Sequence, residues 1–327
     1  MRNLPPQPES VCIDRKPDGE NRMRKIVEAK SPYGVGMMMR VAHVTEDVGA
    51  MVEWYGRVFG ARPGMGYPDP DYLEPEDRYM TTVHVSDLCI EIIAPAKPVN
   101  TQLPVGKFFT KHGDRLHSVG YQVDDPIGLA KHLMNEGVHI AMPGGVPVDQ
   151  MDPEHMYIFP RPKDVAGIAC ELGDSRSIVE GKDLRYVDTW TDVARFWDDH
   201  PSTLKGLGHI TFSVTNLAVA TDTLKTKFLA EIVDEGAREE LGYRYTMARL
   251  GDTLLEVAEP TTPGTHIHDE IQQNGARIYG ITLRVGDLER LTTHLSGLGI
   301  RSTRRSDYVL TAEPSDCNNV PFVFTTR

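Results

Sequence analysis

The chain has 327 residues, 40% hydrophobic and 25% charged, which is enough for two ordinary folded domains. Its formal charge of -12 argues against nucleic acids and anionic membranes as partners, because both attract basic surfaces. No apolar run approaches the roughly 20 residues that span a bilayer.

The N-terminal segment, residues 1–37, is predicted to be a flexible or strapping arm, because it lacks the apolar core of a secretory signal. The four cysteines lie far apart without a CxxC pair: Cys12, Cys89, Cys170 and Cys317. We interpret them as free thiols of a reducing compartment and expect a cytoplasmic protein.

One local plan recurs four times along the chain. A strand rich in Val, Ile, Thr and Tyr leads into an amphipathic helix, and several strands follow. These strands include VAHVT, HSVGYQV, GHITFSV and YGITLRV, which begin at Val41, His117, Gly208 and Tyr279. The repetition predicts four βαβββ units of an α+β protein.

The helices of these units show apolar stripes at steps of three and four residues. The first stripe runs from Val48 to Phe59 and ends at Gly60, and the second helix is expected between Asp125 and Gly137. The other stripes contain Leu217, Leu224 and Phe228, and Leu288, Leu291, Leu295 and Leu298. We predict two domains, at 38–173 and 206–327, and a linker at 174–205 with a helix at TDVARFWDDH.

Two histidines and two glutamates are the candidate site of the first domain. His43 in RVAHVTE is followed by Glu91 in LCIEIIAP, and His117 in LHSVGYQV is followed by Glu171 in GIACELG. Both glutamates stand between apolar neighbours, where an unpaired carboxylate costs several kcal/mol. The repeated pairs therefore predict a divalent-metal site inside a cup.

These motifs resemble the vicinal oxygen chelate superfamily, which includes glyoxalase I, methylmalonyl-CoA epimerase, extradiol dioxygenases and bleomycin-resistance proteins. The segment HVTEDVGAMVEWYGRVFGA is similar to the first strand and helix of that superfamily, and MYIFPRPKDVAGIACELG to its closing hairpin. The resemblance implies two domains, each an incomplete β-barrel with flanking helices. It also implies His43, Glu91, His117 and Glu171 as the ligands of one divalent ion per chain.

The second domain keeps only part of this pattern. His209 and Glu256 are present, but Gly280 replaces the next histidine, and Val323 or Phe324 replaces the last glutamate. We interpret this half as structural, substrate-covering or oligomer-forming, and a homodimer is among the assemblies that we consider.

Other candidates are weaker. His155, His84 and Tyr121 are considered as substrate contacts in the first domain. The acidic residues Glu74, Glu76 and Asp77 are expected in a surface loop, and so is the HxH pair His266 and His268.

Two imidazoles and two carboxylates suit Zn, Ni, Co, Mn or Mg better than Fe. Such an ion leaves two positions for neighbouring oxygens of a small-molecule substrate, and it polarises a carbonyl while the adjacent carbon loses a proton. The resemblance implies Glu171 as the base, and Glu91 could serve the opposite face. This indicates an isomerase, an epimerase or a glyoxalase-type lyase, with a keto-cyclitol or a 2-keto or acyl compound as substrate.

Two alternatives remain open. An extradiol-type Fe(II) ring-cleaving dioxygenase also has four units, but its two His and one Glu lie in the C-terminal half. A non-catalytic resistance-type protein binds a small molecule between its domains and lacks the four ligands.

Overall fold

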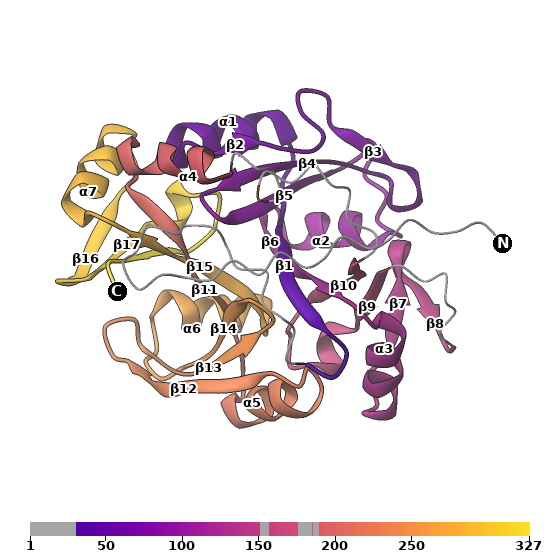
Figure 1. Ribbon diagram of the computed structural model, residues 1–327. Helices are drawn as coiled ribbons and strands as arrows, with labels where there is room; N and C mark the ends of the chain where they lie inside the picture. The colour runs from indigo at the N-terminus through magenta and orange to yellow at the C-terminus, as the bar shows by residue number, and fades with distance from the viewer. Residues whose placement is uncertain (1–30, 151–156, 176–184, 186–189) are drawn as a thin grey trace.

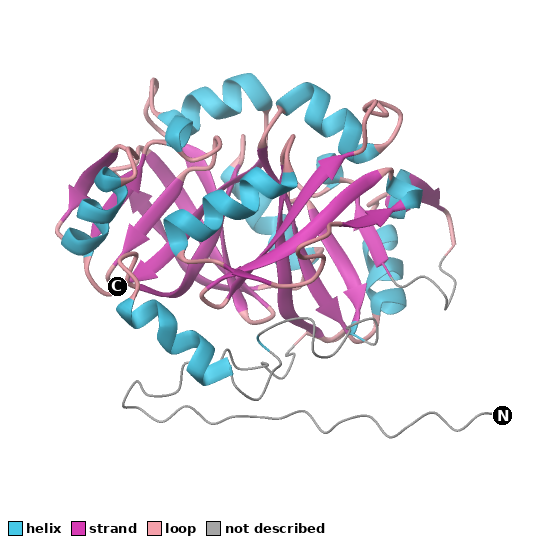
Figure 2. Cartoon of the chain, turned by 90° about the horizontal axis from the view of Figure 1, so that it is seen from above, coloured by secondary structure: helices cyan, strands magenta, loops and turns pink. Residues whose placement is uncertain are grey.

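A computed structural model describes residues 31–150, 157–175, 185 and 190–327. Two curved sheets lie side by side and carry helices on their faces (Figure 1; Figure 2). The first sheet has the strand order β2-β4-β5-β1-β6-β10-β9-β7-β8, with β3 beside β4, and the second has the order β12-β13-β14-β11-β15-β18-β17-β16. The first sheet ends in sequence at Asp174 and the second begins at Leu204.

The elements of the first half are β1 Val35–Val44, α1 Val48–Phe59, β2 Arg62–Pro63, β3 Asp71–Leu73, β4 Arg78–Val85, β5 Leu88–Pro95, α2 Pro104–His112, β6 Arg115–Val123, α3 Pro126–Asn135, β7 Ile140–Met142, β8 Val146–Val148, β9 Tyr157–Pro160 and β10 Cys170–Asp174. A short 3₁₀ turn, Glu74–Glu76, precedes β4.

The elements of the second half are α4 Trp190–Asp199, β11 Leu204–Ser213, α5 Leu217–Thr226, β12 Glu231–Arg238, β13 Tyr243–Leu250, β14 Thr253–Pro260, α6 His266–Asn274, β15 Arg277–Val285, α7 Leu288–Gly297, β16 Ser302–Ser306, β17 Val309–Ala312 and β18 Phe322–Thr325.

Strand pairing confirms the four predicted units and the α+β class. The opening strands pair antiparallel at the centre of each sheet, β1 with β6 and β11 with β15. The closing strand of each unit runs parallel to its own opening strand: β5 to β1, β10 to β6, β14 to β11 and β18 to β15. Each sheet is therefore two repeats joined along their first strands.

The predicted helices correspond to α1, α3, α4, α5 and α7. Asp47 caps α1 by accepting a hydrogen bond from the backbone N–H of Ala50, and Gly60 ends the helix in the left-handed conformation (φ 64°). Two further helices, α2 and α6, were not expected from the sequence; both are short and lie between units. His266 and His268 lie in the first turn of α6, not in a loop.

The two halves pack against each other through hydrogen bonds and ion pairs. The indole N–H of Trp197 in α4 donates to the carbonyl oxygen of Phe59 (2.9 Å), and Arg115 of β6 forms an ion pair with Glu270 of α6 (2.6 Å). Among the described residues, no helix is both long and apolar enough to cross a membrane. Cys89, Cys170 and Cys317 are buried free thiols, whereas Cys12 and most of the predicted arm lie outside the described residues.

Candidate functional site

The two faces of β1 have different surroundings. Ala42 and Val44 pack with Met80, Ile93 and Val105 inside the curve of the first sheet, which we call the N-terminal cup. Val41 belongs to the large core on the other face, beneath the helices. His43 shares that face, because its Nδ1 lies 2.9 Å from the hydroxyl oxygen of Tyr55 in α1.

A buried charge cluster forms the floor of the N-terminal cup. Glu91 of β5 and Glu171 of β10 both contact Arg40 of β1, at 2.9 Å from Nε to Oε2 of Glu91 and 2.5 Å from Nη2 to Oε1 of Glu171. Arg78 of β4 lies 3.2 Å from Glu91 and also pairs with Glu76. Two guanidinium groups thus neutralise most of the charge of three carboxylates.

His117 reaches the same cup through a β-bulge. In the pairing of β1 with β6, Ala42 faces Ser118 and His43 faces Leu116, so His117 is the extra residue. Its Nδ1 lies 2.9 Å from the hydroxyl oxygen of Ser118, and its ring stacks edge-on against Phe108 of α2, 4.7 Å between centroids.

A cavity of about 460 Å³ opens above this floor. Its polar lining includes Arg78, Glu91, Glu171, His117 and Ser118, and its walls are largely apolar, with Ile93, Val105, Ile140 and Phe159. Arg40 does not line this cavity and lies beneath the two carboxylates that it contacts. The cavity therefore has apolar walls and one charged end, a combination that is typical of sites for small molecules.

The two carboxylates of the floor titrate differently. Burial alone would raise the pKa of Glu91, but Arg40 and Arg78 hold it below its ordinary value. Burial and the neighbouring Glu91 raise the pKa of Glu171 above its ordinary value, although Arg40 opposes that shift. Burial, reinforced by Arg78 and Arg277, lowers the pKa of His117 to about 4, so this imidazole is neutral near pH 7.

The structure brings together three of the four predicted metal ligands. Glu91, His117 and Glu171 line one cavity, but His43 lies on the opposite face of β1 and contacts Tyr55. The prediction that His43 joins them is corrected: side chains three residues apart on a strand point to opposite faces, and Arg40 is the one that faces the carboxylates.

The charge cluster does not fit a divalent ion. The guanidinium of Arg40 contacts both Glu91 and Glu171, so a metal bound by these two carboxylates would have to displace it. Throughout the described part of the chain, no group of three or more His, Cys, Asp or Glu side chains is arranged to hold a metal.

The weaker candidates lie elsewhere or outside the described residues. His84 is buried in β4 but does not line the cavity, and Tyr121 is buried in the core on the helix side of β6. His155 lies outside the described residues. Sequence reasoning missed Arg40 and Arg78, although an arginine within MMMRVAHV is as unexpected in a buried strand as the glutamates.

The second sheet encloses a corresponding C-terminal cup. Glu256 pairs with Thr211 across β14 and β11, as Glu91 pairs with Ala42 across β5 and β1. Its carboxylate accepts hydrogen bonds from Thr211 (3.1 Å), Tyr243 (2.9 Å) and Arg238 (2.8 Å), and it lies 3.4 Å from His209 Nε2. Burial would raise the pKa of Glu256, but His209 and Arg238 lower it to about 2.

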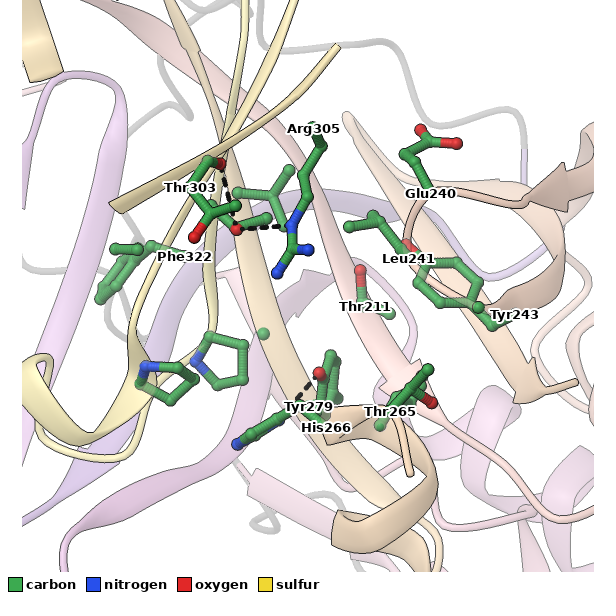
Figure 3. A pocket seen from close by; sticks show the side chains of 18 of the residues that line it. Thr211, Glu240, Leu241, Tyr243, Thr265, His266, Tyr279, Thr303, Arg305 and Phe322 are labelled. Atoms are coloured by element: carbon green, nitrogen blue, oxygen red, sulfur yellow. Dashed lines mark hydrogen bonds between the residues drawn. The ribbon is translucent and has the colours of Figure 1, made fainter. Parts of the chain in front are cut away.

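The predicted loss of ligands from this half agrees with the strand pairing. Val323 pairs with Thr282 where Glu171 pairs with Gly120. A Cβ at Gly280 would lie 2.5 Å from the carbonyl oxygen of Pro321, so no larger side chain fits there. A cavity of about 520 Å³ lies in this half, and Thr211 and Arg305 are among its lining residues. Figure 3 shows His266 in this cavity in contact with the hydroxyl of Tyr279.

No protein-family model and no curated protein matches this sequence. Among solved structures, a triple mutant of 4-hydroxymandelate synthase from Streptomyces coelicolor is similar over 89% of this chain and 92% of that chain, with a TM-score of 0.57 and 12% identity. Methylmalonyl-CoA epimerase from Mycobacterium tuberculosis is similar over 38% of this chain and 89% of that chain, with a TM-score of 0.35 and 21% identity. The first of these likenesses shows the fold and no more.

Proposed function

Because the chain has the fold of the vicinal oxygen chelate superfamily, we propose that its N-terminal cup is the active site of an isomerase that moves a proton next to a carbonyl group. One observation carries this proposal: two buried carboxylates contact the same guanidinium at the floor of one cavity. Neighbouring titratable groups in a cleft of this kind are typical of acid–base sites.

Glu171 is the base in this proposal. Its pKa is raised, so its carboxylate is a stronger base than that of an ordinary glutamate. It can therefore accept a proton from carbon and return it. The proton leaves a hydroxyl-bearing carbon beside the carbonyl and resides on Glu171, while the C–H electron pair forms the enediol. The hydroxyl proton then moves to the former carbonyl oxygen, and Glu171 delivers its proton to the former carbonyl carbon as the first carbon becomes the new carbonyl. Glu91 stays ionised, because its pKa is lowered, and is therefore the poorer proton donor. A single acid–base residue favours isomerisation over a two-base epimerisation.

The cavity also supplies the groups that a developing enolate needs. Arg78 lines the cavity, and its guanidinium can donate to the carbonyl oxygen as that oxygen becomes negative. The neutral His117 and the hydroxyl of Ser118 can orient a second oxygen on the neighbouring carbon. These groups favour a compact carbonyl compound with an apolar portion, such as the 2-keto or keto-cyclitol classes expected from the sequence.

The other candidate functions have less support. A ring-cleaving dioxygenase needs a free carboxylate in the C-terminal half, but Glu256 already contacts four side chains. A binding protein without chemistry would use the same cavity, so only a reaction assay separates it from the isomerase.

The test is exchange of substrate protons with solvent. The protein is incubated in D₂O with a panel of 2-keto acids, keto-cyclitols and acyl compounds, and exchange beside the carbonyl is followed by NMR. We expect exchange with at least one member of the panel, and a loss of about 100-fold or more in Glu171→Gln. Full exchange by that variant excludes Glu171 as the base.

A matched control is Glu256→Gln. It also removes a buried carboxylate that pairs with an arginine, but in the C-terminal cup. The isomerase proposal expects its exchange rate to stay near that of the unmodified protein. Binding of a panel member without any exchange would instead support the resistance-type function.

A further inference from the structure

We propose that Arg40 is the permanent cation of the N-terminal cup and occupies the position that a metal ligand, and the metal with it, would otherwise take. The guanidinium contacts Glu91 through Nε and Glu171 through Nη2. These two carboxylates come from the closing strands of two different units, so Arg40 joins the two repeats as a shared metal ion would.

The internal repeat shows which strand position Arg40 occupies. Glu91 pairs with Ala42, and Arg40 stands two residues before Ala42 on the same face of β1. In the C-terminal cup Glu256 pairs with Thr211, and His209 stands two residues before Thr211 on β11. Arg40 and His209 are therefore equivalent, and each contacts the glutamate of its own cup.

The same rule identifies the matching position in the second unit. Glu171 pairs with Gly120, and Ser118 stands two residues before Gly120 on β6. His117 is the neighbouring bulge residue. A metal centre in this register would use positions 40, 91, 118 and 171, of which this chain has an arginine and a serine at two.

Burial keeps Arg40 permanently in the place of a metal ion and its ligand. The side chain of Arg40 is 18% exposed, and those of Glu91 and Glu171 are 3% and 9% exposed. Burial would lower the pKa of Arg40, but Glu171 and Glu91 raise it above its ordinary value, so the charge is kept. A metal ion would have to break both ion pairs and leave a buried guanidinium unpaired, which is strongly unfavourable.

The test compares metal uptake by four proteins: the unmodified chain, Arg40→His, Arg40→His/Ser118→His, and the control Arg40→Gln. Each is incubated with Zn²⁺, Ni²⁺ or Mn²⁺, desalted and measured by elemental analysis. The double variant is expected to retain about one ion per chain and to gain several degrees in Tm with the metal, because binding stabilises the folded state. The unmodified chain and Arg40→Gln are expected to retain no stoichiometric ion.

Two results would overturn the inference. One is a stoichiometric ion in the unmodified chain that is lost in Glu91→Gln or Glu171→Gln, because Arg40 would then move aside for a metal. The other is a folded double variant, judged by circular dichroism, that retains no ion. Arg40→His provides a milder second variant with one new ligand if the double variant does not fold.

The assignment of Arg40 rests on its contacts with Glu91 and Glu171 and does not depend on proton transfer by Glu171. The two failures are therefore distinguishable. Absence of proton exchange with the metal results intact would reject the isomerase alone, whereas metal uptake by the unmodified chain would reject the role of Arg40 alone.

Discussion

His43 and Arg40 lie three residues apart on β1, and the pleat sends one side chain to the core and the other to the cup. His43 is fully buried, and burial lowers its pKa to about 3. Its neutral ring contacts the hydroxyl of Tyr55, itself buried in α1. The pair connects β1 to the helix that covers it, which is a structural role.

We expect Tyr55→Phe to lower the free energy of unfolding by about 1–3 kcal/mol, because the variant leaves a buried imidazole nitrogen without its partner. Urea denaturation measures this loss. In a His43→Leu background the same change should cost much less. Equal costs in both backgrounds would mean that the hydrogen bond contributes nothing.

The C-terminal end of α1 is more crowded than the C-terminal end of α3. Gly60 has a φ of 64°, and a Cβ there would lie 2.7 Å from Phe196 and 2.8 Å from His200, both at the C-terminal end of α4 or just beyond it. Gly137, after α3, has a φ of 75° and no atom within 4 Å of such a Cβ. Substitutions at these two glycines therefore distinguish the cost of backbone strain from the cost of crowding.

Gly137→Ala is expected to cost about 1 kcal/mol, which is the penalty of the left-handed conformation. Gly60→Ala carries the same penalty plus about 1–3 kcal/mol for displacing α4. Thermal unfolding of both variants, compared with the unmodified chain, measures the difference. Similar losses would show that α4 moves aside without cost.

The sequence predicts the helix α1 but not the orientation of the strand β1. The apolar stripe from Val48 to Phe59 predicted α1 because one face of that helix is polar. The sequence does not show which residues of β1 face the core and which face the cup. Val41, Ala42 and Val44 are apolar and buried on both faces, so no alternation of polar and apolar residues marks them. Without knowing these faces, the sequence favours His43 over Arg40 as the partner of Glu91 and Glu171. The bulge at His117 likewise has no signature in a single sequence.

For the molecule as a whole, the buried titratable groups predict that the free energy of unfolding decreases as the pH falls. The pKa of His43 is about 3 in the folded state, below its ordinary value, and that of Glu256 is about 2. Between the folded pKa and the ordinary pKa of each group, the unfolded chain therefore binds more protons than the folded chain. The free energy of unfolding rises with pH in both of these ranges. The decline on acidification should begin below pH 6.5, where an unfolded histidine takes up its proton.

The slope from His43 alone is at most about 1.4 kcal/mol per pH unit between pH 6.5 and its folded pKa. Denaturation at a series of pH values, in the unmodified chain and in His43→Leu, measures it. We expect a shallower decline in the variant. Parallel curves would place the titration on other groups.

Charged contacts join the two halves, and we expect the halves to unfold together. Arg115 donates to both carboxylate oxygens of Glu270, at 2.6 and 2.7 Å, and both side chains are mostly buried. Glu270→Ala leaves Arg115 unpaired, which for a buried pair costs about 3 kcal/mol or more. We expect calorimetry to show a broadened or divided transition in that variant, whereas one sharp transition would mean that other contacts join the halves.

A cation that belongs to the polypeptide is present as soon as the chain has folded. The N-terminal cup would then need no loading step, no metallochaperone and no competition among the ions of its compartment. Chelators and metal scarcity would leave its charge unchanged, while no exchange of ions could tune it. Substitution at position 40 would be the only way to alter that charge, so adaptation of this cup would proceed through the gene and not through metal supply.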